Sequence, residues 1–131
     1  MNNFLNRIGN SKFGRALGKK YRKKGTIICY HRVMPHLEVS RDKNPGRGLA
    51  ISDKCFDLHL NHLSKNYNVI SMDQMQDHIL SDSDEYFVSI TFDDGYNDNM
   101  KNALPILERY DLPATIYIVT KHPEGKGSIW W

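Results

Sequence analysis

The stretch Tyr86-Phe-Val-Ser-Ile-Thr-Phe-Asp-Asp-Gly95 decides the fold class. Its first seven residues are mostly β-branched or aromatic, and they predict a strand over residues 86–92. The tripeptide Asp93-Asp94-Gly95 favours a turn and ends this strand. In parallel α/β architectures functional side chains gather at the carboxyl ends of strands, so the two carboxylates are candidate site residues.

Strands and helices alternate on both sides of this strand. We expect further strands at 26–30, 67–70 and 114–120, and helices at 52–66, 72–80 and 97–110. Ser52 is the expected N-cap of the first helix, and Ser71 with Gln74 has capping-box spacing at the start of the second. Pro105 is expected to kink the third helix or delay its regular part. The alternation predicts an α/β fold with a parallel sheet or a partial barrel.

The chain of 131 residues is long enough for one domain with a core and too short for two. Its net charge of +3 conceals an uneven distribution. Residues 1–24 hold eight basic residues and no acidic one, whereas the remainder holds 10 basic and 15 acidic residues. We therefore divide the chain into a basic N-terminal arm, 1–25, and a globular part, 26–131. This pattern does not indicate a nucleic-acid groove.

The basic arm has helical periodicity, because Leu5, Ile8, Leu17 and Tyr21 fall on one stripe. Two interpretations remain open: a helix that makes weak peripheral contact with anionic lipid through residues 1–24, or a solvated helix packed loosely on the domain. No apolar run approaches the roughly 20 residues that span a bilayer. The first residues are polar where a secretory signal would be apolar, so we expect a cytoplasmic protein.

Cysteines and histidines elsewhere in the chain suggest no further site. Cys29 and Cys55 lack Cys-x-x-Cys spacing, and we expect buried free thiols. His59 and His62 share a neighbourhood on the predicted helix, but the leucines beside them point that helix at the core. We therefore expect no metal site at these two histidines.

The turn after the central strand offers more chemistry. Side-chain direction alternates along an extended chain, so Asp93 and Asp94 point in different directions, and one can hold a metal ion while the other faces a bound water. Gly95 permits a tight turn and leaves room for a substrate close to the backbone. Gly95 and Tyr96 are therefore candidate substrate-binding residues. Taken alone, Asp-Asp-Gly is also an ordinary turn sequence.

The surrounding residues resemble the first motif block of the polysaccharide deacetylases, that is, the NodB-homology domain of carbohydrate esterase family 4. The matching string is Thr91-Phe-Asp-Asp-Gly95, Tyr96-Asn-Asp-Asn99, Ala103-Leu-Pro-Ile-Leu107 and Leu112-Pro-Ala-Thr-Ile-Tyr-Ile-Val119. Upstream, Ile28-Cys-Tyr-His-Arg-Val33 and the run from Phe56 to Ser71 are similar to the N-terminal part of the same proteins. The resemblance covers roughly 26–131 and implies an incomplete, distorted β/α barrel of the glycoside hydrolase/deacetylase type.

This resemblance also implies a reaction and roles for three residues. Asp93 would be the general base, Asp94 a ligand of a divalent metal, usually zinc, and His31 the general acid. The implied reaction is hydrolysis of an N-acetyl group on a hexosamine of a polysaccharide or glycoconjugate, a hydrolase activity of carbohydrate metabolism. Histidine suits the acid role because its ordinary pKa of about 6.5 permits both protonation states near neutrality.

One part of the family pattern does not occur in these 131 residues, namely the His-x-x-x-His motif that completes the metal site. Zinc in a catalytic site normally has three protein ligands. The sequence also finishes on Trp130 and Trp131, large side chains that usually pack in a core. We therefore expect a truncated deacetylase domain, inactive alone. The alternatives are a non-catalytic remnant or carbohydrate-binding fragment and, more remotely, a phosphoryl-accepting receiver domain.

Overall fold

A computed structural model of the chain describes residues 25–39, 48–81 and 85–121. The predicted helical arm and its proposed lipid contact fall in residues 1–24, outside the described residues. Within the described ranges, no helix combines the length and the apolar character that crossing a membrane requires.

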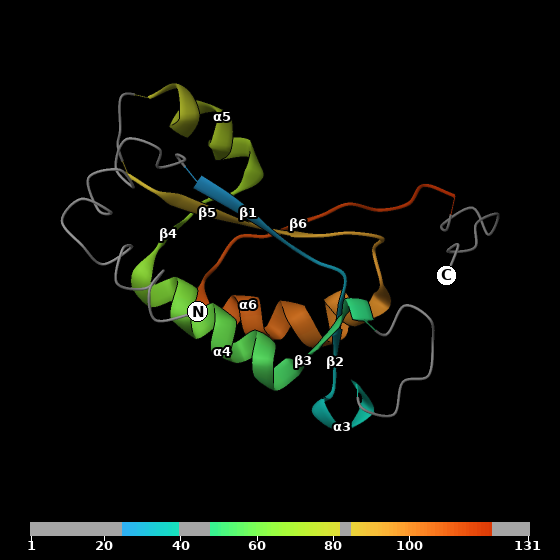
Figure 1. The fold of residues 1–131 in the computed structure, drawn as a ribbon. Helices are drawn as coiled ribbons and strands as arrows, with labels where there is room; N and C mark the ends of the chain where they lie inside the picture. The colour runs from blue at the N-terminus through green and yellow to red at the C-terminus, as the bar shows by residue number, and fades with distance from the viewer. Residues whose placement is uncertain (1–24, 40–47, 82–84, 122–131) are drawn as a thin grey trace, which may run out of the picture.

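Within the described residues, four parallel strands form the main sheet (Figure 1). Strand β1 (Gly25–Tyr30) pairs along its whole length with β5 (Phe87–Phe92). The other side of β5 is shared by β4 (Asn68–Val69), which pairs with its start, and β6 (Thr115–Ile116), which pairs with its end. All six residues of β5 are buried, so the strand predicted most clearly from the sequence is the centre of the sheet.

A second, smaller sheet and a short helix lie beyond the carboxyl end of β1. The sheet consists of β2 (Arg32–Met34) paired in parallel with β3 (Ala50–Ser52). Helix α3 (His36–Val39) follows β2. These elements lie between the first predicted strand and the first predicted long helix, where the sequence predicted no regular structure.

Helices cover both faces of the main sheet. Helix α4 (Asp53–Asn66) and helix α6 (Leu104–Tyr110) lie on one face, and α5 (Met72–Leu80) lies on the other (Figure 1). The predicted caps are present: Ser52 accepts a hydrogen bond from the N–H of Cys55, and Ser71 and Gln74 form a capping box. The observed order of strands and helices confirms the predicted α/β fold with a parallel sheet.

The core lies between the sheet and the pair α4 and α6. Alternate residues of β5 point to it, because side-chain direction has a period of two in a strand. The buried cluster contains Tyr30, Val33, Phe56, Leu60, Leu63, Val88, Ile90, Phe92, Ala103, Ile106 and Leu107. On the opposite face, the ring of Phe87 meets the ring of His78 from α5 at a centroid distance of 5.2 Å.

The last predicted helix and strand differ from expectation in detail. The predicted helix over 97–110 includes a π-helical segment, η2 (Asn99–Ala103), before α6 begins. Pro105 lies in the first turn of α6, where a proline costs no hydrogen bond, so it delays the regular helix. The predicted strand over 114–120 pairs only at Thr115–Ile116, and the residues that follow are exposed.

Two leucines of α4 provide a test of the core. Leu60 is fully buried, whereas Leu58 is 64% exposed. Replacing Leu60 by Ala should lower the free energy of unfolding by about 2–5 kcal/mol, because the side chain is lost from a packed core and leaves a cavity. The matched Leu58→Ala should change it by less than about 0.5 kcal/mol. Urea denaturation followed by circular dichroism measures both, and equal losses would contradict the core described above.

Candidate active site

The carboxyl ends of β1 and β5 meet at one rim of the sheet. The backbone N–H of Asp93 donates to the carbonyl oxygen of Tyr30 at 2.9 Å, which continues the parallel ladder one residue beyond β5. Tyr30 points into the core, so Cys29 and His31 on either side of it point to the other face of the strand. This register brings both side chains next to Asp93.

Three potential metal-binding or proton-transferring groups cluster there. The Sγ atom of Cys29 donates to Oδ2 of Asp93 at 3.3 Å, and Nε2 of His31 lies 3.9 Å from the same oxygen. One ligand atom from each of the three residues lies within 4.8 Å of the other two. The side chains of His31 and Asp93 are 23% and 43% exposed, so water and a substrate can reach the cluster.

The second carboxylate, that of Asp94, belongs to the turn that follows β5. Asp94 and Gly95 both have positive φ, 70° and 66°, which is the left-handed region that glycine adopts readily and other residues rarely do. A Cβ atom at position 95 would also approach Cγ1 of Ile118 to 3.3 Å. The predicted tight turn at Gly95 is therefore present, and Asp94 lies within it.

Asp94 has an unusual feature of its own. Its Oδ2 atom is buried and has no hydrogen-bond partner in the described part of the chain. A buried carboxylate oxygen without a partner is costly, and metal coordination is one way to satisfy it. Asp94 thus fits the ligand role that the resemblance implies, although one carboxylate is insufficient for zinc.

Tyr30 anchors the end of β1 through contacts on the core side of the sheet. Its ring packs edge-on against Phe56 at a centroid distance of 5.0 Å, and its hydroxyl group lies 3.1 Å from Nδ1 of His59. Burial raises the pKa of Tyr30 to about 12. Tyr30 is therefore a neutral, packed residue that holds the neighbouring His31 in place, and His59 contacts this anchor.

A polar network fixes the segment after His31. Nε of Arg32 donates to Oδ2 of Asp98 at 2.9 Å, and the guanidinium group lies 5.0 Å from the ring centre of Tyr96. The amide nitrogen of Asn99, in the orientation that satisfies its neighbours, donates to the carbonyl oxygen of His31 at 2.9 Å. Tyr96 therefore packs against Arg32, directly after the turn at Asp94 and Gly95.

The predicted site residues thus fall into two groups. The structure brings His31 and Asp93 together, and it places Asp94 and Gly95 in the turn beside them. Cys29 was not predicted as a site residue, and the expectation that both cysteines are buried is wrong, because Cys29 and Cys55 are exposed. The signal available in the sequence was the Cys29-x-His31 spacing, which puts both residues on the same face of a strand.

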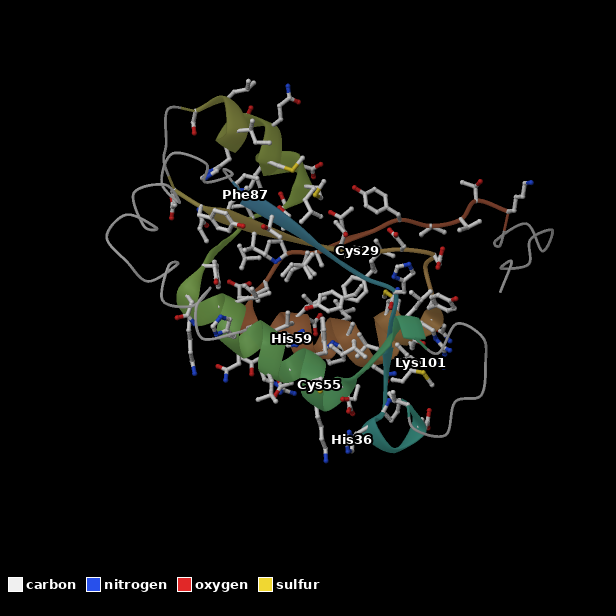
Figure 2. The ribbon with its side chains drawn as sticks, in the orientation of Figure 1. Cys29, His36, Cys55, His59, Phe87 and Lys101 are labelled. Atoms are coloured by element: carbon white, nitrogen blue, oxygen red, sulfur yellow. The ribbon has the colours of Figure 1, made fainter. Side chains whose placement is uncertain are left out.

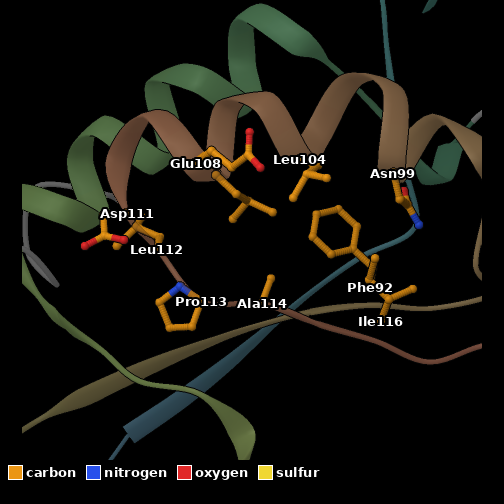
Figure 3. A pocket seen from close by; sticks show the side chains of 10 residues that line it. Phe92, Asn99, Leu104, Glu108, Asp111, Leu112, Pro113, Ala114 and Ile116 are labelled. Atoms are coloured by element: carbon orange, nitrogen blue, oxygen red, sulfur yellow. The ribbon is translucent and has the colours of Figure 1, made fainter.

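A hollow near the site lies on the core side of the sheet. A cavity of about 350 Å³ lies between β6 and α6, and its lining is mainly apolar (Figure 3). Phe92, Leu104 and Ile116 project into it. Phe92 precedes Asp93 and points to the opposite face of the strand, so the cavity is separate from the candidate site.

The contact between Cys29 and Asp93 can be tested by alkylation. Partial burial of the sulfur raises the pKa of the Cys29 thiol above its ordinary value, and the hydrogen bond to Asp93 raises it further. In a Cys55→Ser background, Asp93→Asn should lower this pKa and speed the reaction of Cys29 with iodoacetamide at pH 8. Each unit of pKa changes the thiolate fraction about tenfold but intrinsic reactivity only about threefold, so the thiolate fraction decides the rate. An unchanged rate would contradict the contact.

Comparison with known proteins places this geometry in a family. The model of the family "Polysaccharide deacetylase" matches residues 81–129, which include β5 and the Asp-Asp-Gly turn. The chain is 32% identical over 98 residues to "Putative polysaccharide deacetylase YxkH" of Bacillus subtilis (strain 168). This match covers 72% of the chain and 32% of the relative, so the chain spans about a third of the length of that protein.

Solved structures of deacetylases have a fold similar to that of this chain. The de-N-acetylase of Aggregatibacter actinomycetemcomitans superposes with a TM-score of 0.61 at 31% identity, over 74% of this chain and 38% of that one. The deacetylase PplD of Streptococcus pyogenes, solved with acetate, gives a TM-score of 0.60 at 25% identity, over 81% and 47% of the two chains. These matches confirm the predicted fold, part of a deacetylase-type β/α barrel. The chain belongs to the polysaccharide deacetylase family.

Proposed function

We propose that this chain carries the general base, the general acid and one metal ligand of an enzyme that removes acetyl groups from N-acetylated hexosamines in a polysaccharide or glycoconjugate. One observation supports this proposal most strongly. Asp93 follows the central strand, and Nε2 of His31 from the neighbouring strand lies 3.9 Å from its carboxylate. An acid and a base on one open rim are what amide hydrolysis requires.

Asp93 suits the base role. Its carboxylate is 43% exposed, so a water molecule can approach it, while its backbone N–H is fixed by the carbonyl oxygen of Tyr30. A carboxylate whose backbone is hydrogen-bonded at the end of a regular strand keeps its position relative to a bound substrate. Asp93 would take the proton of the attacking water.

His31 suits the acid role. It extends from the end of β1, and its carbonyl oxygen accepts a hydrogen bond from Asn99. Its Nε2 lies 3.9 Å from Oδ2 of Asp93, so the imidazole and the carboxylate border the same open rim, where the scissile amide would approach both. Protonated His31 would donate its proton to the departing amine.

Asp94 would be the metal ligand, because its buried Oδ2 has unused acceptor capacity. A divalent ion such as zinc, when bound, polarises the acetyl carbonyl and acidifies a coordinated water. The remaining ligands of the family pattern form a His-x-x-x-His motif that these 131 residues lack. We therefore propose that this chain is inactive alone, and that Gly95 and Tyr96 contribute to the substrate surface beside the reacting groups.

A hybrid enzyme tests the proposal. In the hybrid, this chain's matching segment replaces that of the Bacillus subtilis relative, which supplies the rest of the domain. We expect the hybrid to release acetate from N-acetylglucosamine oligomers in the presence of zinc, and the isolated 131-residue chain to release none. Asp93→Asn should lower kcat in the hybrid by about 10²–10⁴-fold, the usual contribution of a general base.

The control is Asp77→Asn, which removes an exposed carboxylate on α5 and should leave kcat unchanged. A folded hybrid that binds the oligomers without releasing acetate would favour a carbohydrate-binding fragment over the catalytic proposal. Equal effects of Asp93→Asn and Asp77→Asn would contradict the role of Asp93.

A further inference from the structure

The cluster at the rim contains one group that the proposed reaction does not use. Cys29 is exposed, and its sulfur lies 3.3 Å from the oxygen of Asp93 that also faces His31. In proteins, cysteine thiolates, histidine imidazoles and carboxylates coordinate zinc, and sulfur ligands also favour softer divalent cations. Asp94, the metal ligand of the proposed reaction, is not part of this cluster.

The spacing of the three ligand atoms is close to that of a metal site. Tetrahedral zinc, with bonds of about 2.3 Å to sulfur and about 2.0–2.2 Å to nitrogen and oxygen, holds its ligand atoms roughly 3.3–3.6 Å apart. The sulfur–oxygen distance of 3.3 Å already agrees with this spacing. The nitrogen–oxygen distance of 3.9 Å exceeds it by about half an ångström, and the sulfur–nitrogen distance is at most 4.8 Å, so the His31 side chain moves inward when an ion binds.

The backbone keeps the three groups together. Cys29 in β1 and His31 directly after it lie on the same face, and the hydrogen bond from the N–H of Asp93 to the carbonyl oxygen of Tyr30 fixes Asp93 beside them. Preorganised ligands on paired strands lose little conformational freedom when an ion binds. Three protein ligands also leave a fourth position open to water.

We propose that Cys29, His31 and Asp93 form a second metal site, which takes a thiophilic divalent cation such as Zn²⁺ or Cd²⁺. Binding forms a sulfur–metal bond and releases the thiol proton of Cys29 to solvent. The site differs from the one at Asp94 in its ligands, because it uses the other carboxylate of the Asp-Asp pair together with Cys29 and His31.

Occupation of this site has a consequence that rests on the proposed function. A cation bound to Asp93 and His31 takes both the general base and the general acid out of the reaction. The chain would then be inhibited by the same kind of ion that its Asp94 site requires, at concentrations above those that fill the Asp94 site. The binding itself does not depend on the reaction, so the two proposals can fail separately.

Binding is tested on the reduced 131-residue chain with Co²⁺ as a spectroscopic probe and Zn²⁺ as competitor. We expect one equivalent of Co²⁺ to produce a thiolate-to-cobalt charge-transfer band, and Zn²⁺ to abolish it. Cys29→Ser should remove the band. His31→Ala and Asp93→Asn should each weaken Co²⁺ binding by about tenfold or more. Loss of a residue that only orients a ligand already costs roughly tenfold, and these two residues are direct ligands.

Cys55→Ser is the matched control, because Cys55 is the other exposed thiol and lies on α4, away from the sheet (Figure 2). Its cobalt spectrum should equal that of the unmodified chain. Far-ultraviolet circular dichroism checks that each variant is folded. A second readout is alkylation: Zn²⁺ should protect Cys29 and leave Cys55 reactive. A cobalt band that persists in Cys29→Ser, or equal protection of both thiols, would overturn the site.

The inhibitory consequence is tested in the hybrid. Excess Zn²⁺ should lower acetate release by the hybrid, and Cys29→Ser should raise the zinc concentration needed for half inhibition by about tenfold or more. An inactive hybrid that still shows the Cys29-dependent cobalt band would contradict the proposed function and leave the metal site intact. An active hybrid without the band would contradict the metal site alone.

Discussion

The parallel pairing of β1 with β5 is the constraint on which the rest of the structure depends. Six residues of each strand are in register, and the hydrogen bond from Asp93 to Tyr30 carries the ladder one residue further. A shift of this register by one residue would turn Cys29 and His31 into the core and Tyr30 out of it. The same pairing thus buries the aromatic anchor and exposes the reactive groups.

Tyr30 explains why the register is so well defined. Its ring packs against both Phe56 and Phe92, at centroid distances of 5.0 and 5.6 Å, and its hydroxyl group reaches His59 on α4. Aromatic burial of this kind stabilises the fold beyond what a single backbone hydrogen bond contributes. The packing of Tyr30 in the core therefore fixes the positions of Cys29 and His31 on either side of it.

Local sequence was sufficient to predict much of the fold. The β-branched run before Asp93 predicted the central strand, and Ser52 and Ser71 predicted the starts of α4 and α5, because strand propensity and helix capping are properties of a few adjacent residues. The alternation of elements then predicted the parallel sheet. His31 and Asp93 were predicted as partners from a resemblance, and their shared rim was consistent with the order of elements.

Other features arise from tertiary contacts and could not be predicted in this way. The position of Cys29 beside Asp93 depends on the register between two strands that are about 60 residues apart in the sequence. The π-helical segment η2 is also a product of tertiary structure. Asn99 donates to the carbonyl oxygen of His31 and Asn102 to that of Val33, so this part of the helix is tied to β2. Propensity contains no information about such contacts.

Helix α5 differs from the other long helix in a way that affects the dynamics of the molecule. None of its residues is buried, its terminal Leu80 is 74% exposed, and it covers the face of the sheet opposite α4 and α6 (Figure 1). Segments with few buried contacts open locally at a free-energy cost well below that of global unfolding. The amide hydrogens of α5 would therefore exchange with solvent much earlier than those of β5, and the sheet would keep its reactive rim while this helix detaches.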